Sequence, residues 1–215
     1  MRTTTVTENL IQLTRLRFVN AYLVREDDGF TLVDTTIAGA ADGLIGAARA
    51  AGGEIRRIVI THGHGDHVGS LDVLKETLGV PVYMPELDAR IHAGEKPYEG
   101  KLRGGWPKLK TVADDRIDDG ERIGSLKVVA TPGHTPGHIS LLDTRDRSLL
   151  AGDALETMGG IAIPDHFKPR FPLVWAATWD RARAGESAQV LRALEPTLIA
   201  AGHGKVTRDP IPAPR

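Results

Sequence analysis

Two kinds of hydrophobic pattern alternate along the chain, one with the spacing of strands and one with the spacing of helices. Short runs rich in Val, Ile, Leu and Phe, bounded by turn-forming residues, predict strands at residues 15–26, 30–36, 56–62, 80–84, 126–130, 138–143, 148–151 and 197–201. Apolar residues that recur every three or four positions predict helices at residues 41–51, 70–78 and 179–194. Strands interspersed with helices are typical of layered α/β folds. Because no linker divides the sequence, we expect a single domain over residues 1–215.

Two long segments interrupt this pattern. Residues 93–114 are rich in Gly, Lys and Pro, and residues 157–175 mix Gly and Pro with large apolar side chains. Long irregular segments within a domain are usually either functional or disordered. We expect ordered walls or lids here. Their large aromatic side chains would either line a substrate pocket or pack in the core: Trp106, Phe167, Phe171 and Trp175. His166 would either contact substrate or be a solvated loop residue.

The composition excludes several kinds of site. Acidic and basic residues nearly balance, 28 against 27, and they form no long block of one sign, so we expect no nucleic-acid partner. The absence of cysteine excludes disulfides, thiolate metal sites and a cysteine nucleophile. We expect neither a signal peptide nor a membrane span, because no apolar run is long enough. These features favour a cytoplasmic protein.

The segment THGHGDHVG at residues 61–69 concentrates metal-binding side chains in one turn. Three of the eight histidines and one aspartate fall within six positions, directly after an apolar predicted strand. Positions two apart in an extended chain project to the same side, so His62, His64 and Asp66 can converge while His67 points elsewhere. A solvated polar loop would be the alternative to a metal site, but this spacing is better explained by two neighbouring cations.

Three further donors follow predicted strands elsewhere in the chain: His134 in GHTPGH, Asp153 in GDA and His203 in GHG. Strand ends that lead into glycine-containing turns are common places for active sites. The motif HGHGDH, followed by these three motifs in this order, resembles the metallo-β-lactamase-fold hydrolases over nearly the whole chain. The resemblance implies a four-layer αββα sandwich with metals at one edge of its two sheets.

The same resemblance implies a role for each donor. It assigns His62, His64 and His134 to one cation and Asp66, His67 and His203 to a second, with Asp153 bridging the two. Asp34 would orient a ligand imidazole, and His138 would pack beside the ligands without binding metal. His92 lies on a predicted helix, where we expect it at the surface.

Imidazole and carboxylate ligands without thiolate favour two Zn²⁺ ions, with Mn²⁺, Fe²⁺ or Co²⁺ as alternatives. Such a pair of cations can share a hydroxide at neutral pH and polarise a carbonyl group. Asp66 is the expected catalytic residue, because its carboxylate can also orient that hydroxide. This chemistry favours hydrolysis of a small-molecule ester, lactone or thioester. The sequence does not predict an oligomeric state.

Differences from known branches of the family narrow the reaction. Asp153 disfavours antibiotic hydrolysis, because the β-lactamases of this fold lack a bridging carboxylate. His64 stands where the flavodiiron proteins carry Glu. The lactonases use a Tyr between the bridging Asp and the last His, and no Tyr lies between Asp153 and His203. The glutathione thioesterases carry a helical extension after the last His, which we do not expect in this chain.

Three alternatives to this hydrolase remain open. A phosphodiesterase or nuclease would use the same pair of metals. A persulfide dioxygenase would use a single iron. A metal-stabilised binding module would catalyse nothing.

Overall fold

The computed structural model describes residues 1–214, and two β-sheets form its centre. The first sheet has seven strands, which are adjacent in chain order. They are β1 (Arg2–Thr5), β2 (Leu10–Arg15), β3 (Val19–Glu26), β4 (Gly29–Val33), β5 (Ile55–Val59), β6 (Val82–Pro85) and β7 (Asp115–Ile117). Strands β1 to β4 are antiparallel neighbours, whereas β4 to β7 are parallel.

The second sheet has five strands in the order β12-β11-β10-β9-β8. They are β8 (Arg122–Ile123), β9 (Leu126–Ala130), β10 (Ile139–Asp143), β11 (Ser148–Gly152) and β12 (Leu198–Ala201). Only β11 and β12 pair in parallel. Their carboxyl ends therefore lie side by side at one edge of this sheet.

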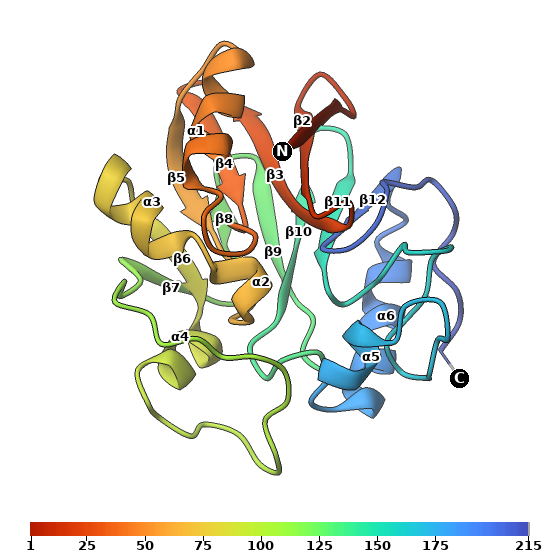
Figure 1. Cartoon of the computed structure of the whole chain (residues 1–215). Coiled ribbons are helices and arrows are strands. Elements are labelled where there is room, and N and C mark those ends of the chain that lie inside the picture. Colours follow the sequence, from red (N-terminus) through yellow and green to blue (C-terminus); the bar gives the residue numbers. More distant parts are fainter. Residues whose placement is uncertain (215) are drawn as a thin grey trace.

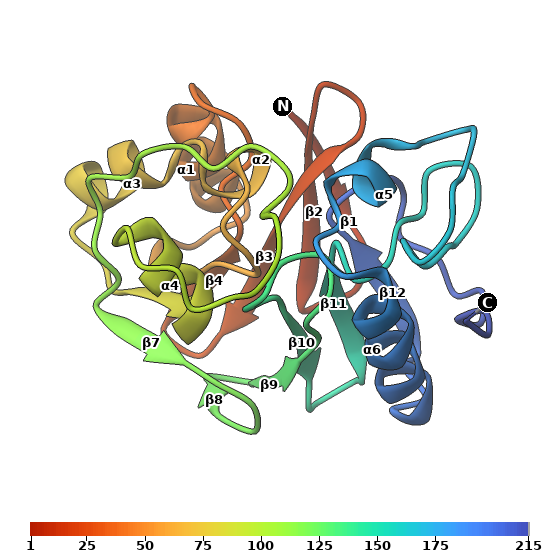
Figure 2. The same cartoon turned by 90° about the horizontal axis from the view of Figure 1, so that it is seen from below.

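Helices cover the outer face of each sheet, as Figures 1 and 2 show. On the first sheet lie α1 (Ala41–Ala50), α2 (Gly65–Val68), α3 (Leu71–Leu78) and α4 (Glu86–His92). On the second lie α5 (Leu173–Ala177) and α6 (Arg181–Ala193). The result is the four-layer αββα sandwich that the family resemblance implies. Within residues 1–214, no helix is both long and apolar enough to cross a bilayer.

The alternation of strand residues explains how these layers pack. In β3, Tyr22 and Val24 point into the apolar layer between the two sheets, while Ala21 and Leu23 point toward the helices of the first sheet. Successive strand residues face opposite sides, and both faces of β3 are buried. A sheet that is covered on both faces is held between two apolar layers. Its strand ends are therefore well fixed, and so are the side chains that follow them.

The structure corrects part of the predicted element order. Residues 15–26 do not form one strand, because Leu16 and Arg17 have positive φ values of 49° and 72° and reverse the chain between β2 and β3. The hydrophobic pattern at residues 15–26 does not reveal this turn, because apolar residues stand on both sides of it. The short strands β1, β7 and β8 also lack a predicted counterpart, since each is too short to show alternation, and β2 shares only Arg15 with the predicted strand. The short helices α2 and α5 have no predicted counterpart either.

Candidate metal centre

All seven predicted donors converge at one edge of the two sheets. The first four follow β5 and run into α2, while His134 follows β9, Asp153 directly follows β11 and His203 follows β12. Their ligand atoms form overlapping groups within which all atoms lie within 4.8 Å of one another. These groups are His62–His64–His134, Asp66–His67–His203 and His62–His67–Asp153. Donors that are far apart in the sequence therefore meet in one place.

The first group consists of three imidazoles whose inner nitrogens face one another. Nδ1 of His64 lies 3.0 Å from Nε2 of His134, and Nε2 of His62 is buried without a hydrogen-bond partner. The outer nitrogen of each ring contacts one oxygen at 3.1 Å: Thr61 Oγ1 for His62, the Arg103 carbonyl for His64 and Thr178 Oγ1 for His134.

Those oxygens determine where the ring protons lie. Thr61 donates its hydroxyl proton to Asp34, and Thr178 donates its own to the carbonyl of Val174. Each hydroxyl oxygen is thus an acceptor toward its histidine, and the Arg103 carbonyl can only accept. The protons consequently sit on the outer nitrogens, and three lone pairs face inward. Facing lone pairs repel one another unless a cation lies between them, so the arrangement fits a metal ion.

The second group contains a carboxylate. Oδ2 of Asp66 lies 3.3 Å from Nε2 of His203 and 4.0 Å from Nε2 of His67. Nδ1 of His67 donates to Asp34 Oδ2 at 2.8 Å, which leaves its buried Nε2 directed into the site without a hydrogen-bond partner. A carboxylate behind a ligand imidazole fixes its tautomer and raises its basicity. Asp34 therefore occupies the orienting position that the resemblance implies.

Asp153 lies between the two groups. Its Oδ2 is 3.4 Å from Nε2 of His134 and 3.2 Å from Nε2 of His203, and its Oδ1 is 3.5 Å from Nε2 of His67. The side chain is almost completely buried. One carboxylate thus contacts nitrogens of both groups, as a bridging ligand must.

The histidines of the first group are neutral. Burial lowers the pKa of His62 and of His134 well below the ordinary value, and it lowers the pKa of His64 to about 4. Neutral imidazole is the form that binds a metal. This group can accept a cation without first losing protons.

The second group carries more charge. Burial alone would lower the pKa of His67, but the carboxylates of Asp34, Asp153 and Asp66 raise it well above the ordinary value. Asp153 likewise raises the pKa of His203 to about 9, against the effect of burial. Without a metal, the two imidazoles are therefore protonated, because the surrounding carboxylates create a strong negative potential at this group. A divalent cation would displace these protons, since metal binding and ligand deprotonation are coupled.

His138 is fully buried beside the site but is not available as a ligand. Its Nε2 accepts the backbone N–H of Asp153 at 2.9 Å, so its proton sits on Nδ1 and is donated to Thr131 at 2.8 Å. Burial lowers the pKa of His138 to about 3, which keeps it neutral and able to accept. Both nitrogens are used, and the residue holds the backbone of Asp153.

A buried aspartate that sequence reasoning missed holds the loops of the first group. Asp88, on α4, accepts hydrogen bonds from the N–H of Gly63 at 2.9 Å, the hydroxyl of Thr135 at 2.7 Å and the N–H of Gly137 at 2.7 Å. Gly63 separates His62 from His64, and Thr135 follows His134. Burial raises the pKa of Asp88 to about 6. One side chain thereby fixes both loops that supply the first group.

Two glycines allow the close approach that the site requires. Gly104 has a φ of +76°, and a Cβ on it would collide with the imidazole of His64. A Cβ on Gly202, one residue before His203, would collide with Asp153 and His67. Any larger residue at either position would displace ligand side chains.

The structure places the predicted pocket residues in different surroundings. Trp106 packs edge-on against His64 with ring centroids 5.3 Å apart, and Phe171 lies 5.2 Å from the ring of His203. Trp175 and Phe167 contact each other at 5.2 Å, and His166 pairs with Asp165 at the half-exposed surface. Two of the five therefore lie against candidate ligands, and three lie farther out.

His92, which we expect at the surface, is only partly exposed. It is half-buried, and its Nε2 donates to the carbonyl of Gly63 at 2.9 Å. Its ring centroid lies 5.2 Å from that of Trp106, with the two rings tilted by 48°. Its helix is α4, and the loop 93–114, which carries Trp106, packs over that helix and covers part of the ring.

A small cavity of about 90 Å³ opens onto the metal centre. Besides five of the candidate ligands it is lined by apolar side chains alone: Phe18, Leu173, Val174 and Ala177. None of these four was predicted. Phe18 lies in the turn that the sequence pattern missed, and the other three belong to α5.

Comparisons with known proteins agree with this geometry. The family model of the metallo-beta-lactamase superfamily matches residues 14–203. Relatives from Bacillus subtilis include "Uncharacterized protein YobT", 42% identical over 89% of this chain and 85% of that protein, and "Probable metallo-hydrolase YflN", 30% identical over 88% and 81%.

A hydroxyacylglutathione hydrolase of Rhodopseudomonas palustris is 32% identical over 61% of this chain and 45% of its own length. The solved structure "Crystal structure of TTHA1623 in a di-iron-bound form" superposes with a TM-score of 0.69 at 27% identity and covers 92% of both chains. The metal-binding motifs, the αββα sandwich and these matches lead to one conclusion: the chain is a metal-dependent hydrolase of the metallo-beta-lactamase superfamily.

Proposed function

We propose that the chain holds two divalent cations, with zinc as the expected metal, and hydrolyses a small thioester. His62, His64 and His134 would hold the first cation, and Asp66, His67 and His203 the second. The observation that carries this proposal is the position of Asp153, whose two oxygens lie 3.2–3.5 Å from imidazole nitrogens of both groups. A bridging carboxylate suits a pair of cations better than a single one.

Two divalent cations at this site would supply an ionised water molecule at neutral pH and polarise the carbonyl oxygen of the substrate. Asp66 is the residue that can orient the attacking water. It lines the small cavity, its side chain is partly exposed, and His67 and His203 lower its pKa despite the opposing effect of burial. Its ionised Oδ2 can therefore accept a hydrogen bond from the water.

The lining of the small cavity favours a thioester over a lactone or an ester. Apart from the candidate ligands, its four side chains are apolar and cannot donate a proton to a leaving group. Tyr22 cannot do so either, because its hydroxyl is buried and donates to the carbonyl of Ala201 at 2.6 Å. A thiol has an ordinary pKa of about 8.5, so it can leave as a thiolate, whereas an alkoxide requires a proton.

The size of the cavity favours a short acyl group, since about 90 Å³ accommodates only a few heavy atoms. The similarity to a hydroxyacylglutathione hydrolase supports the same reaction class.

The test begins with elemental analysis of the purified protein, for which we expect two metal ions per chain. Acetyl thioester, γ-butyrolactone and bis-(p-nitrophenyl) phosphate are then offered to the metal-loaded enzyme. We expect the thioester to be cleaved fastest, activity to disappear after chelation, and Zn²⁺ or Mn²⁺ to restore it. Faster phosphodiester cleavage would favour the phosphodiesterase, and one iron per chain with oxygen uptake on a persulfide would favour the dioxygenase.

A further inference from the structure

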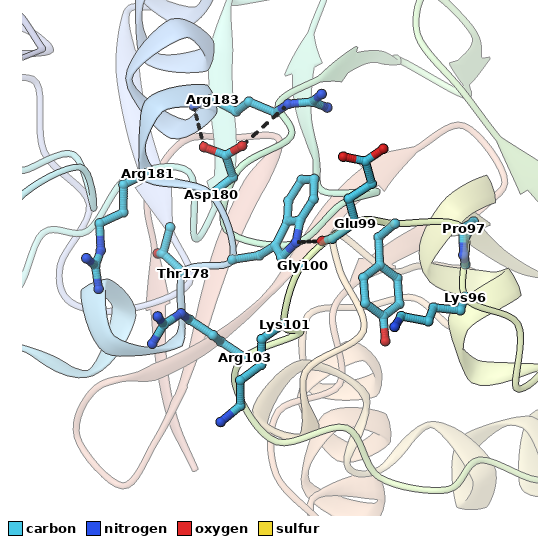
Figure 3. A pocket seen from close by; sticks show the side chains of 12 residues that line it. Lys96, Pro97, Glu99, Gly100, Lys101, Arg103, Thr178, Asp180, Arg181 and Arg183 are labelled. Atoms are coloured by element: carbon cyan, nitrogen blue, oxygen red, sulfur yellow. Dashed lines mark hydrogen bonds and ion pairs between the residues drawn. The ribbon is translucent and has the colours of Figure 1, made fainter.

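A second and much larger cavity, of about 860 Å³, lies next to the metal centre. Figure 3 shows it between the loop at residues 96–103 and the chain segment at residues 178–183. Two of its lining residues contact candidate ligands directly. The carbonyl of Arg103 lies 3.1 Å from His64, and the hydroxyl of Thr178 lies 3.1 Å from His134. A molecule in this cavity would lie one imidazole ring away from the reaction centre.

The walls of the large cavity carry an excess of positive charge. The cationic residues that line it are Lys96, Lys101, Arg103, Arg181 and Arg183, and the acidic ones are Glu99 and Asp180. Asp180 is already engaged, because it caps α6 through the N–H of Arg183 at 3.1 Å and pairs with the same side chain at 3.6 Å.

Four of these cations have no carboxylate partner in the part of the chain that the structure describes. Among residues 1–214, no carboxylate lies within ion-pair distance of Lys96, Lys101, Arg103 or Arg181. The whole chain has a net charge of only −1, so this local excess does not reflect a generally basic protein. Cations gathered without counter-ions around a concave site raise the local concentration of anions.

Aromatic side chains hold several of these groups in place. The Arg181 guanidinium lies 4.0 Å above the ring of Trp175, and the Lys96 ammonium lies 5.8 Å from the ring centre of Tyr98. Trp179 donates from its indole nitrogen to the carbonyl of Glu99 at 2.9 Å, which joins the two walls. Contacts with aromatic faces restrict a long cationic side chain without neutralising it. The cavity is therefore already arranged to receive an anion.

We propose that this cavity binds the anionic arm of the substrate, through its carboxylate or phosphate groups, while the acyl group enters the small apolar cavity. The inference rests on the proposed thioester hydrolysis and names its substrate class: thioesters of an acidic thiol. A volume of about 860 Å³ is within the range of small-molecule sites. The subsite is built from residues 96–103 and from the segment that opens α6.

The experiment compares three thioesters with the same acetyl group on the metal-loaded enzyme. One has the uncharged thiol N-acetylcysteamine, one has glutathione with its carboxylates, and one has coenzyme A with its phosphates. We expect at least one anionic thioester to be favoured through a lower KM, at a similar kcat. The preference should shrink in 0.5 M salt, because partly exposed charges are screened.

Variants locate the preference. In Lys101→Ala and Arg181→Ala, the ratio of kcat/KM for the preferred anionic thioester to that for the neutral one should fall about three- to fivefold each, as for the loss of a partly exposed ion pair. Arg181→Lys should retain most of the ratio. Lys127→Ala, an exposed lysine on β9, serves as the matched control and should leave the ratio unchanged. Because both kcat/KM values are measured on the same variant, their ratio is unaffected by a general loss of folded protein or of bound metal.

The outcomes separate this inference from the proposed function. Equal kcat/KM for all three thioesters, or a ratio unchanged in both alanine variants, would overturn the subsite while leaving thioester hydrolysis intact. If no thioester is cleaved, the proposed function fails, and calorimetry with S-methylglutathione and S-methyl-coenzyme A then decides the subsite. Binding that weakens in both alanine variants would support it, and no binding, or tighter binding of a single-stranded oligonucleotide, would overturn it.

Discussion

The two halves of the metal centre are supported by buried aspartates that act in different ways. Asp34 contacts the second group directly, since it accepts the Nδ1 proton of His67 and also bonds Thr61. Asp88 contacts none of the candidate ligands and instead holds the backbone of the two loops that carry the first group. One aspartate determines the charge and tautomer of a ligand, and the other determines where ligands lie.

This difference has a physical reason. The first group consists of neutral imidazoles, which need precise placement but no compensating charge. The second group combines a carboxylate with two imidazoles whose pKa values are raised, so its electrostatics depend on nearby anions. Three predictions test this division, and a fourth contrasts it with a buried carboxylate outside both halves; they run from the largest expected effect to the smallest.

Asp153→Ala should have the largest effect, because Asp153 serves both halves. We expect turnover to fall by more than about 100-fold, the loss that removal of a single supporting residue behind a ligand can already cause. Metal content should fall to one ion or fewer per chain, as measured by elemental analysis. Asp42→Ala, an exposed aspartate on α1, is the control and should keep wild-type activity. Full activity in Asp153→Ala would contradict the bridging role.

Asp34→Asn should disturb the second half most directly, because Asp34 contacts His67 itself but reaches His62 of the first group only through Thr61. Three donors now point at the two oxygens of Asp34, and an amide offers only one acceptor atom. An NH₂ group turned toward His67 would force its proton onto Nε2, the atom that faces the site. We expect about a 10–100-fold loss in metal affinity or activity, with one of the two ions lost first in a chelator titration. Simultaneous loss of both ions would argue against two distinct halves.

Asp88→Asn should act mainly on stability. At least one of the three donors would face an NH₂ group, and a buried donor left unsatisfied costs about 1–3 kcal/mol. Thermal unfolding should therefore shift downward, and activity should fall less than in Asp34→Asn. Glu86→Gln on the same helix is the control, since Glu86 makes only partly exposed ion pairs. An activity loss larger than that of Asp34→Asn would reverse the ranking of the two aspartates.

Glu156→Gln tests a buried carboxylate that neither half uses. Its Oε2 has no hydrogen-bond partner, and burial raises its pKa from 4.5 to about 7, with Lys168 4.0 Å away. Between these pH values the unfolded chain loses the proton while the folded chain keeps it, so stability falls as the pH rises from 4.5 to 7. The glutamine variant should therefore gain on the order of 1–3 kcal/mol above pH 7 and nothing below pH 4.5.

Thermal unfolding of both proteins across this pH range measures the difference. Glu186→Gln, an exposed position on α6, should show no such trend. A constant gap at all pH values would mean that Glu156 does not titrate in this range.

The sequence alone predicts much of the metal centre. Each predicted donor stands directly after an apolar strand or in a glycine-containing turn, so the local pattern determines both its chemistry and its place at a strand end. The position of Asp34 at the end of β4 follows in the same way. The hydrophobic pattern also predicts mixed layers of strands and helices, whereas the two-sheet sandwich follows only from the family resemblance.

What only the tertiary structure decided are contacts between segments far apart in the chain. The carbonyl of Arg103 supports a histidine 39 residues away, Thr178 supports one 44 residues away, and Asp88 reaches Gly137 across 49 residues. No local period specifies such contacts, because they depend on how a loop without regular structure packs over two sheets. The same holds for the cationic cavity. Neither of its two walls, residues 96–103 and 178–183, has a distinctive sequence pattern, and their positive charges come together only when the chain folds.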